Sequence, residues 1–334
     1  MTRGPMIRWG FLGAGFIATN ALAPAVAEAD GAVLQAVAAR DVARAQALEP
    51  AGAAYGSYDD LLADDSVDAV YISLTNDVHA AWSIAAMQAG KHVLCEKPLA
   101  MSAAQVQAMA EVSAETGRLL VEASWYRWHP RARLAGDVLR SGRIGPVVHV
   151  SAGFTFNGRL AGNYRLEVER GGGALYDVGC YAVSAALWAF GDIATTVSAR
   201  QELGPTGVDV VTEAVLEFPA GDAEVRAGIS EPPRQWLVIT GESGEIELRD
   251  AAYTSWMRDD TVLLVSDGRS TDRTTVPAAN AYRVMVEEVS AVIGGNPGWV
   301  VPLPESLATA AMLDAAFASG RAGGSPVAVT TPAP

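Results

Sequence analysis

Cysteine, histidine and lysine are scarce in this sequence, and each scarcity excludes a class of structure. The 334 residues contain two cysteines, Cys95 and Cys180, which are too few for a disulfide framework and are typical of a reducing cytosol. The four histidines are scattered and none is paired with a cysteine. We therefore expect no structural zinc site and no bound metal.

Long hydrophobic runs and positive charge are lacking as well. No apolar run reaches the ~18 residues of a membrane span, and Met1–Arg8 lead directly into a glycine-rich turn instead of the apolar stretch of a signal peptide. The 38 acidic residues outnumber the 24 basic ones, giving a net charge of -14, and such a surface repels nucleic acid. We expect a cytoplasmic protein that binds neither a membrane nor nucleic acid.

Lys91 and Lys97 are the only lysines among the basic residues, and the rest are arginine. A chain with this bias keeps lysine by chance or where a guanidinium would fail, because lysine is compact and can lower its pKa when buried. Lys91 follows Gly90 in the turn before an apolar strand, so we expect it to be a solvated surface charge. Lys97 follows the same strand, at its other end.

Half of the residues are apolar, and their pattern along the first third of the chain alternates strands with helices. This alternation is typical of a parallel sheet covered on both faces. The strands are expected at Ile7–Leu12, Val33–Ala39, Ala69–Leu74, His92–Cys95 and Leu119–Ala123. The helices are expected at Ile17–Ala29, Val42–Leu48, Tyr58–Ala63, Val78–Ala89, Ala103–Thr116 and His129–Ser141.

From Pro146 onward, longer alternating segments separated by turn residues indicate a large, mostly antiparallel open sheet. Its strands are expected at Val147–Phe156, Thr195–Glu202, Val208–Phe218, Ala223–Ile229, Gln235–Thr240 and Glu245–Arg249. Helices are expected at Val178–Phe190, Ala281–Ile293 and Leu303–Ser319. The predicted fold class is α/β, a Rossmann doubly wound parallel sheet followed by an α+β domain.

A glycine-rich turn, Gly13-Ala14-Gly15-Phe16-Ile17-Ala18, joins the first strand to the first helix. Gly13 permits the tight turn, Gly15 lets the backbone approach a pyrophosphate, and Ala18 lets the helix pack closely on the strand. The N–H groups at the helix start, around Phe16 and Ile17, favour a diphosphate. We therefore expect a dinucleotide-binding domain over residues 1–128 and a domain for substrate binding and oligomerisation over residues 129–334.

The type of dinucleotide is decided after the second strand, where an acidic residue binds the ribose of NAD and a cation binds the 2′-phosphate of NADP. Arg40 and Arg44 stand four residues apart and can face one phosphate if a helix begins near Asp41. Asp41 is either a ribose ligand or the N-cap of that helix, and both arginines can also be plain surface residues. The prediction is NADP, with NAD possible.

Two further segments carry groups suited to proton transfer. Lys97, in Glu96-Lys97-Pro98, is delivered to the carboxyl edge of the parallel sheet, where doubly wound folds bind ligands; its alternative role is a salt bridge with Glu96. Asp177 and Tyr181 follow three glycines at a spacing that places them on one helical face. Tyr181 exchanges a proton if an ammonium lowers its pKa from ~10, although an aromatic residue at such a position is often part of the core.

These motifs together resemble the Gfo/Idh/MocA oxidoreductases. The resemblance runs from about Ile7 to Phe190 and rests on the glycine turn, on Asn76 and His79, on Glu96-Lys97-Pro98, and on the glycine run with Asp177 and Tyr181. Many members end the last motif in histidine. Tyr181 is similar instead to the branch that contains dimeric dihydrodiol dehydrogenase, glucose–fructose oxidoreductase and NADP-dependent xylose dehydrogenases. Thr75 departs from the proline that many members have there.

The resemblance implies roles for individual residues. It implies that Tyr181 is the proton donor or acceptor, that Lys97 lowers its pKa, and that Asp177 lies nearby. The residues expected to bind the cofactor are Gly13, Gly15, Phe16, Ile17, Arg40, Arg44, Leu74, Asn76, His79, Glu96 and Lys97. The residues expected near the substrate are Trp125, Arg127, Phe154, Asn163 and Arg165, with Trp128 and Phe156 as further aromatic candidates for stacking.

The function that the resemblance implies is NADP-dependent hydride transfer to or from a sugar-like alcohol or carbonyl, or a cyclic diol. One alternative is glucose–fructose-type transfer with a retained cofactor. Another is a catalytically silent dinucleotide-binding regulator, because a fold does not establish a function. The exposed face of the second domain's sheet, with Glu213 and Glu217 on one side of a strand, predicts a homodimer or a larger homo-oligomer.

Overall fold

The structure is a computed structural model that describes residues 5–158, 162–249, 251–253 and 260–332. The chain forms two compact units, which are described separately. The first unit comprises Met1–Ala100, Gln105–Trp128 and Asn280–Leu303, and the second comprises Met101–Ala104, His129–Ala279 and Pro304–Pro334. One boundary between the units lies between residues 128 and 129. Residues 280–303 belong to the first unit, whereas all residues after 128 were predicted to belong to the second domain.

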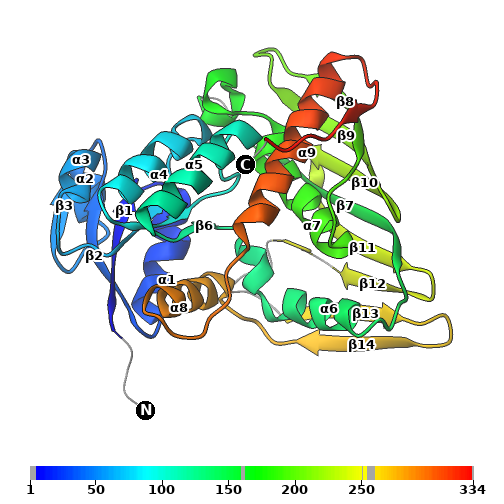
Figure 1. The fold of residues 1–334 in the computed structure, drawn as a ribbon, viewed down its shortest axis with the longest axis horizontal. Helices are drawn as coiled ribbons and strands as arrows, with labels where there is room; N and C mark the ends of the chain where they lie inside the picture. The colour runs from blue at the N-terminus through cyan, green and yellow to red at the C-terminus, as the bar shows by residue number, and fades with distance from the viewer. Residues whose placement is uncertain (1–4, 159–161, 250, 254–259, 333–334) are drawn as a thin grey trace. The chain divides into compact units, whose positions relative to one another are not determined.

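The first unit is built on a parallel six-stranded sheet with the order β3-β2-β1-β4-β5-β6 (Figure 1). The strands are β1 (Ile7–Leu12), β2 (Ala32–Ala38), β3 (Ala53–Tyr55), β4 (Ala69–Ile72), β5 (His92–Cys95) and β6 (Leu120–Glu122). This is the order of the Rossmann fold, whose ligands bind at the carboxyl ends of the strands where the order reverses. The predicted fold class is confirmed; β3 was not predicted.

The helices of the first unit follow the expected pattern. They are a π-helical turn (Ala18–Leu22) continuing into α1 (Ala23–Glu28), then α2 (Val42–Gln46), α3 (Tyr58–Leu62), α4 (His79–Gln88), α5 (Ala103–Thr116) and α8 (Ala281–Ile293), with 3-10 turns at Asn76–Val78 and Trp125–Trp128. Side-chain caps fix several of the starts, because the first N–H groups of a helix need acceptors. The carboxylate of Asp41 accepts from the N–H of Ala43 at 3.1 Å, and the amide oxygen of Asn280 accepts from the N–H of Arg283 at 3.2 Å.

Aromatic contacts explain why α8 belongs to the first unit. Trp125 stacks on Tyr282 with ring centroids 4.8 Å apart. Trp128 packs edge-on against Trp299 at 5.0 Å, and its indole N–H donates to the Trp299 carbonyl at 3.2 Å. Buried aromatic pairs of this kind add to the free energy of burial. Trp128 is fully buried, so the expectation that it stacks on a substrate is wrong.

Lys91 corrects another expectation, because it is not a solvated charge. The residue is 6% exposed, and its ammonium donates to the carbonyls of Asp64 at 2.7 Å and Val67 at 2.9 Å. Burial lowers the pKa of Lys91, and the carboxylates of Asp65, Asp64 and Asp68 oppose that shift. The turn before β5 therefore uses a lysine to satisfy two carbonyls of the preceding loop.

The second unit is built on a nine-stranded sheet with the order β14-β13-β12-β11-β7-β10-β9-β8-β15. The strands are β7 (Val147–Asn157), β8 (Thr196–Leu203), β9 (Asp209–Phe218), β10 (Gly221–Gly228), β11 (Ser230–Gly241), β12 (Gly244–Arg249), β13 (Thr261–Ser266), β14 (Thr271–Val276) and β15 (Val327–Ala328). The pairs are antiparallel except β7 with β10. This confirms the mostly antiparallel sheet and adds β13, β14 and β15, which were not predicted.

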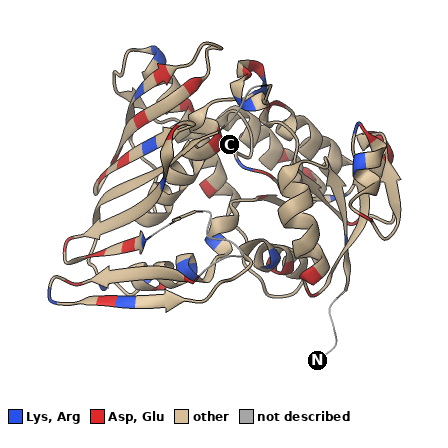
Figure 2. Ribbon diagram, turned by 180° about the vertical axis from the view of Figure 1, so that it is seen from behind, with Lys and Arg blue, Asp and Glu red and all other residues tan. Residues whose placement is uncertain are grey.

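Helices cover part of this sheet. They are α6 (Pro130–Arg140), a π-helical turn (Leu175–Gly179) continuing into α7 (Cys180–Phe190), and α9 (Leu303–Arg321). The helix α7 packs on β7 and β10, and α6 packs on β12 and β13. In Figure 2, charged residues lie among uncharged ones along the strands of this sheet. On β9, for example, exposed Glu213, Val215 and Glu217 alternate with buried residues, as expected for a sheet with one face packed.

One helical stretch of the second unit, Val168–Phe190, is long and apolar enough to cross a membrane, with a mean hydropathy of 1.2 over its most apolar window. Glycines and charged residues interrupt this stretch, so it contains no unbroken apolar run of that length. In the structure, 78% of that window is buried inside the protein, as in a core helix.

Candidate active site

The glycine-rich turn after β1 has the geometry of a phosphate-binding loop. Gly13 has a φ of +103°, and a Cβ there would lie 2.9 Å from the carbonyl oxygen of Ser73, so a side chain is excluded. A Cβ at Gly15 would meet only that same oxygen, at 3.8 Å, which leaves space beside the backbone. The helix starts at once, with the N–H of Thr19 donating to the carbonyl of Gly15 at 3.0 Å. The loop therefore presents backbone N–H groups next to open space.

Arg44 lies beside this loop. One of its guanidinium nitrogens donates to the carbonyl of Ala14 at 2.5 Å. Asp41 caps α2, so of its two suggested roles the helix cap is the one seen. Burial raises the pKa of the Tyr58 phenol, while the positive charges of Arg40 and Arg44 oppose that shift. Tyr58 was not among the predicted site residues.

The loops that follow β4 and β5 are joined by His79. This residue is fully buried, and its ring nitrogens lie 2.9 Å from the carbonyl of Pro98 and 3.2 Å from that of Leu74. Burial lowers the pKa of the imidazole, and the nearby charge of Lys97 acts in the same direction. His79 thus lies behind the two loops and holds them together. The peptide bond between Lys97 and Pro98 is cis.

Two carboxylates brace the turn that carries Lys97. Tyr71 donates its hydroxyl hydrogen to Glu96 at 2.7 Å, and the other oxygen of Glu96 accepts from the N–H of Lys97 at 3.3 Å. Buried Glu122, at the end of β6, accepts from the N–H of Leu99 at 3.0 Å. Asn76 is 4% exposed at the start of the neighbouring 3-10 turn. Glu122 was missed by sequence reasoning, although its place at a strand's carboxyl end is a usable signal.

In the second unit, Tyr181 lies in a cluster of aromatic rings. Its ring centroid is 5.8 Å from that of Phe154 and 5.6 Å from that of Tyr253, and Phe154 stacks on Tyr253 at 6.1 Å. Phe156 is 6.3 Å from Phe154. Tyr181 itself is 7% exposed at the start of α7. Tyr253 was not predicted, because the segment around it shows no regular pattern.

Asp177, in the π-helical turn before α7, forms an ion pair with Arg165. The Nε of Arg165 donates to the carboxylate at 2.6 Å. Burial alone would lower the pKa of the guanidinium, but Asp177, Tyr164 and Tyr181 together outweigh it and raise that pKa. The positive charge therefore lies within electrostatic reach of the Tyr181 phenol.

The residues expected near a substrate thus have definite partners within their own units. Asn163 accepts from the N–H of Arg165 at 3.1 Å. The Nε of Arg165 is paired with Asp177, while its side chain stays 28% exposed. Arg127 is 8% exposed, with its guanidinium 5.5 Å from the centre of the Trp299 ring. Trp125 is 2% exposed against Tyr282.

Comparison with known proteins identifies the family of this chain. Residues 7–124 match the Gfo/Idh/MocA oxidoreductase family with its NAD-binding Rossmann fold, and residues 132–247 match the Gfo/Idh/MocA C-terminal domain. An NADP-dependent D-xylose 1-dehydrogenase of Haloferax volcanii is 36% identical over 94% of this chain and 98% of its own. The chain belongs to the Gfo/Idh/MocA family. The predicted resemblance is confirmed, and the protein is an oxidoreductase.

Two further proteins of known activity are similar to this oxidoreductase. A trans-1,2-dihydrobenzene-1,2-diol dehydrogenase of Xenopus tropicalis is 34% identical over 72% of this chain and 74% of its own. A 3-ketoreductase from Actinomadura kijaniata, solved with NADP and TDP-benzene, has a TM-score of 0.86 at 28% identity and covers 94% of this chain and 98% of its own. The same reductase has been solved with a single tyrosine replaced by phenylalanine and with a single lysine replaced by alanine.

Proposed function

We propose that this protein is an NADP-dependent oxidoreductase that moves a hydride between nicotinamide and a sugar-like alcohol or carbonyl, with Tyr181 as acid and base and Lys97 as its assisting cation. One observation carries the catalytic assignment. The tyrosine and the lysine replaced in the solved variants of the 3-ketoreductase are as many positions apart as Tyr181 and Lys97 are here. Each of the two residues lies at the end of a defined element in its own unit.

The preference for NADP is supported by the arginines after β2. Arg44 bonds to the glycine-rich loop, and the positive charges of Arg40 and Arg44 act on the same phenol, that of Tyr58. Arginine binds phosphate with paired, charge-assisted hydrogen bonds. Asp41, the residue that would otherwise bind the ribose of NAD, is occupied as a helix cap. The xylose dehydrogenase relative is also NADP-dependent by name.

Replacing Arg40 and Arg44 by alanine should therefore weaken NADP use selectively. We expect the KM for NADP to rise by about tenfold to a hundredfold, the usual cost of lost charge-assisted contacts, with the KM for NAD little changed. Initial rates with both cofactors measure this, and Arg118→Ala in the same unit is the control. Equal losses for NAD and NADP would contradict the assignment.

The reaction steps proposed for this chain are proton and charge handling. When bound, the cofactor would accept the hydride at its nicotinamide ring as NADP+ during oxidation and supply it as NADPH during reduction. Tyr181 takes the proton of the substrate hydroxyl during oxidation and returns it to the carbonyl oxygen during reduction. Lys97 stabilises the negative charge on the phenolate and on the substrate oxygen. Asp177 and Arg165 fix the segment from which Tyr181 projects.

The substrate class follows from the relatives' names. By their names they act on xylose, on a cyclic diol and on a keto-sugar nucleotide, so in each case the reacting carbon is an alcohol or carbonyl carbon of a sugar or a cyclic diol. We propose a sugar or cyclic diol, with D-xylose as the first compound to test. The experiment is a screen for cofactor reduction with sugars and diols, with NADP and NAD side by side.

The screen also separates the alternative functions. Oxidation of an aldose that stops after one equivalent, and resumes when a ketose is added, would identify transfer with retained cofactor. Tight NADP binding without turnover on any sugar or diol would contradict the proposal and favour a silent regulator.

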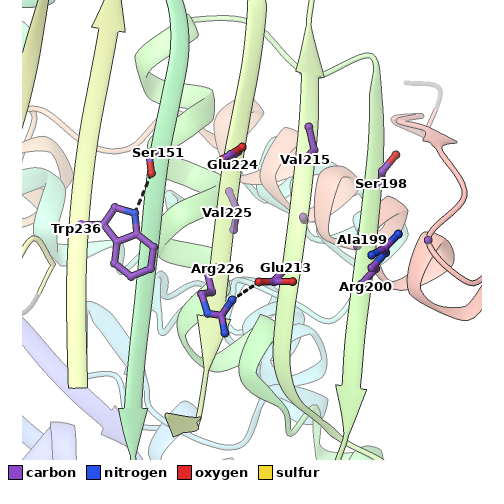
Figure 3. Close-up of a pocket in the computed structure, with 12 residues that line it drawn as sticks. Ser151, Ser198, Ala199, Arg200, Glu213, Val215, Glu224, Val225, Arg226 and Trp236 are labelled. Carbon is purple, nitrogen blue, oxygen red and sulfur yellow. Dashed lines mark hydrogen bonds and ion pairs between the residues drawn. The ribbon is translucent and has the colours of Figure 1, made fainter. Parts of the chain in front are cut away.

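We also propose a homo-oligomer formed through the exposed face of the nine-stranded sheet. This face holds a hollow of about 560 Å³ lined by strands β7 to β11 and Gly324 (Figure 3). Its lining includes Trp236, Val215 and the ion pair between Arg226 and Glu213. Ser151 of β7 lines the hollow, whereas Phe154 of the same strand contacts Tyr181. These two residues are three positions apart, and side chains an odd number of positions apart on a strand point to opposite faces of the sheet. The hollow is therefore on the face opposite Tyr181.

Val215→Glu should dissociate such an oligomer, because it places a charge on a face that would be buried between copies. Light scattering should show a dimer or larger species for the wild type and a monomer for the variant, with Val168→Glu as the exposed control. A wild-type monomer at micromolar concentration would contradict the proposal.

A further inference from the structure

Asp209, the first residue of β9, has a buried carboxylate aimed at the start of the helical segment that carries Asp177 and Tyr181. The residue is 3% exposed. One carboxylate oxygen accepts from the N–H of Leu175 at 2.8 Å and from the hydroxyl of Thr212 at 2.6 Å. The backbone N–H of Ala174 also favours the charged form of this carboxylate. The first N–H groups of the segment are thus satisfied by one side chain from a neighbouring strand.

The glycine run makes this contact possible. Gly173 has a φ of +112°, and a Cβ there would lie 2.0 Å from the other oxygen of Asp209. A Cβ on Gly172 would lie 2.5 Å from the carbonyl oxygen of Arg165, which accepts from the N–H of Gly173 at 2.9 Å. Only glycine fits at position 173, where both the conformation and the approach of Asp209 exclude a side chain.

We propose that Asp209 is a positioning residue for catalysis: its carboxylate holds the N–H groups at the start of the π-helical turn and so fixes the places of Asp177 and Tyr181. This rests on the proposed function of Tyr181. Asp209 accepts a hydrogen bond from Leu175 at the beginning of the segment, and Arg165 forms an ion pair with Asp177 two residues later. The ionised carboxylate is important because charge-assisted hydrogen bonds are stronger than neutral ones, and because negative charge is favourable at a helix N-terminus.

The ionisation of Asp209 falls in an accessible pH range. Burial raises the pKa of Asp209 to about 6, although hydrogen bonds from Thr212 and from backbone N–H groups favour the charged form. The titratable groups around it are Tyr176 of the same segment and, next to Tyr176, Asp314 and Arg321 of α9. Protonation of Asp209 below about pH 6 should therefore loosen the segment.

Loosening of the segment by protonation of Asp209 differs from acid unfolding, because this protonation does not lower the free energy of unfolding. A carboxyl whose pKa is higher in the folded state than in the unfolded state favours folding when it is protonated. The ionisation of Asp209 thus costs stability as the pH rises from its ordinary pKa of 3.8 to about 6, and the full cost remains above that. On acidification through pH 6, Asp209 does not weaken the fold. We expect the segment to loosen reversibly, with no fall in Tm caused by this group.

The test is amide hydrogen exchange of residues 174–181 on the full-length protein, corrected for intrinsic rates. In the wild type, exchange should be at least about tenfold faster at about pH 5 than at about pH 8. Asp209→Asn should give the faster rate at both pH values. Asp222→Asn, which alters a half-buried carboxylate on β10 of the same sheet that contacts His149, should behave like the wild type.

A kinetic measurement completes the test. With NADP and D-xylose, Asp209→Asn should lower kcat by about tenfold or more while the Kd for NADP is unchanged. Wild-type exchange that is the same at both pH values would overturn the proposal, and it needs no variant to fold. Faster exchange in a protein that oxidises no sugar would leave the positioning role supported and remove the proposed function instead. An unchanged kcat alongside faster exchange would also overturn the catalytic role.

Discussion

Tyr181→Phe is expected to lower kcat by about 10²- to 10⁴-fold, the range over which a positioned acid or base accelerates proton transfer. The substitution removes the hydroxyl and keeps the ring. The contacts with Phe154 at 5.8 Å and Tyr253 at 5.6 Å are therefore preserved, and the fold has no reason to change. The loss should appear in kcat and in kcat/KM alike, because the hydroxyl acts in the transition state.

The measurement is steady-state turnover with NADP and the best substrate of the screen, together with NADP binding. Tyr55→Phe is a matched control, since it removes a phenol that only bonds to Asp64 in the first unit, at 3.1 Å. We expect it to keep kcat within a few-fold. If Tyr181→Phe keeps at least half of the wild-type kcat, the acid–base role belongs to another group.

Most regular elements could be predicted because local patterns encode them. The strand His92–Cys95 and the helices Ala103–Thr116 and Ala281–Ile293 have the predicted bounds. In each case apolar residues recur with the period of the element, and glycine or polar residues flank it. The exceptions follow the same physics. The strand Ala53–Tyr55 is too short to show a period, and Thr271–Val276 is polar, with five exposed residues.

What the sequence could not predict depends on contacts between distant segments. The return of residues 280–303 to the first unit depends on the pairs Trp125–Tyr282 and Trp128–Trp299. No local pattern distinguishes a tryptophan that packs on a later helix from one that lines a pocket. The burial of Lys91 likewise depends on two backbone carbonyls of an earlier loop.

The residues of the candidate site also fall into two groups, those that the sequence predicts and those that only the folded chain reveals. The glycine-rich turn and Arg44 could be predicted, because the chemistry of phosphate binding leaves a short motif. Asp209 could not, because it is far from Tyr181 in sequence and follows no motif, yet it bonds to the segment that carries Tyr181. Arg165 was predicted as a residue near the substrate, but its ion pair with Asp177 was not. Positioning residues are visible only once the chain is folded.

Lys97→Arg is the second substitution with a large expected effect. We expect kcat to fall by about 10²-fold or more, although the charge is kept. The ammonium is a compact point charge on a flexible stem, whereas the guanidinium is planar and larger. The turn that carries Lys97 is braced by hydrogen bonds from the N–H of Lys97 to Glu96 and from the N–H of Leu99 to Glu122, so it has little freedom to move back and make room. The Kd for NADP should change much less than kcat.

The second lysine supplies the control, because the same substitution there should have the opposite signature. Lys91→Arg places a larger group where an ammonium lies between two carbonyls at 2.7 and 2.9 Å, and overpacking of this kind costs about 1–3 kcal/mol. It should lower Tm and leave kcat of the folded enzyme within a few-fold. Lys97→Arg should lower kcat and leave Tm unchanged. If both variants lost only stability, Lys97 would be a structural lysine like Lys91, and Tyr181 would need another cation. Arg165 is a candidate, because its charge and the Tyr181 phenol interact electrostatically.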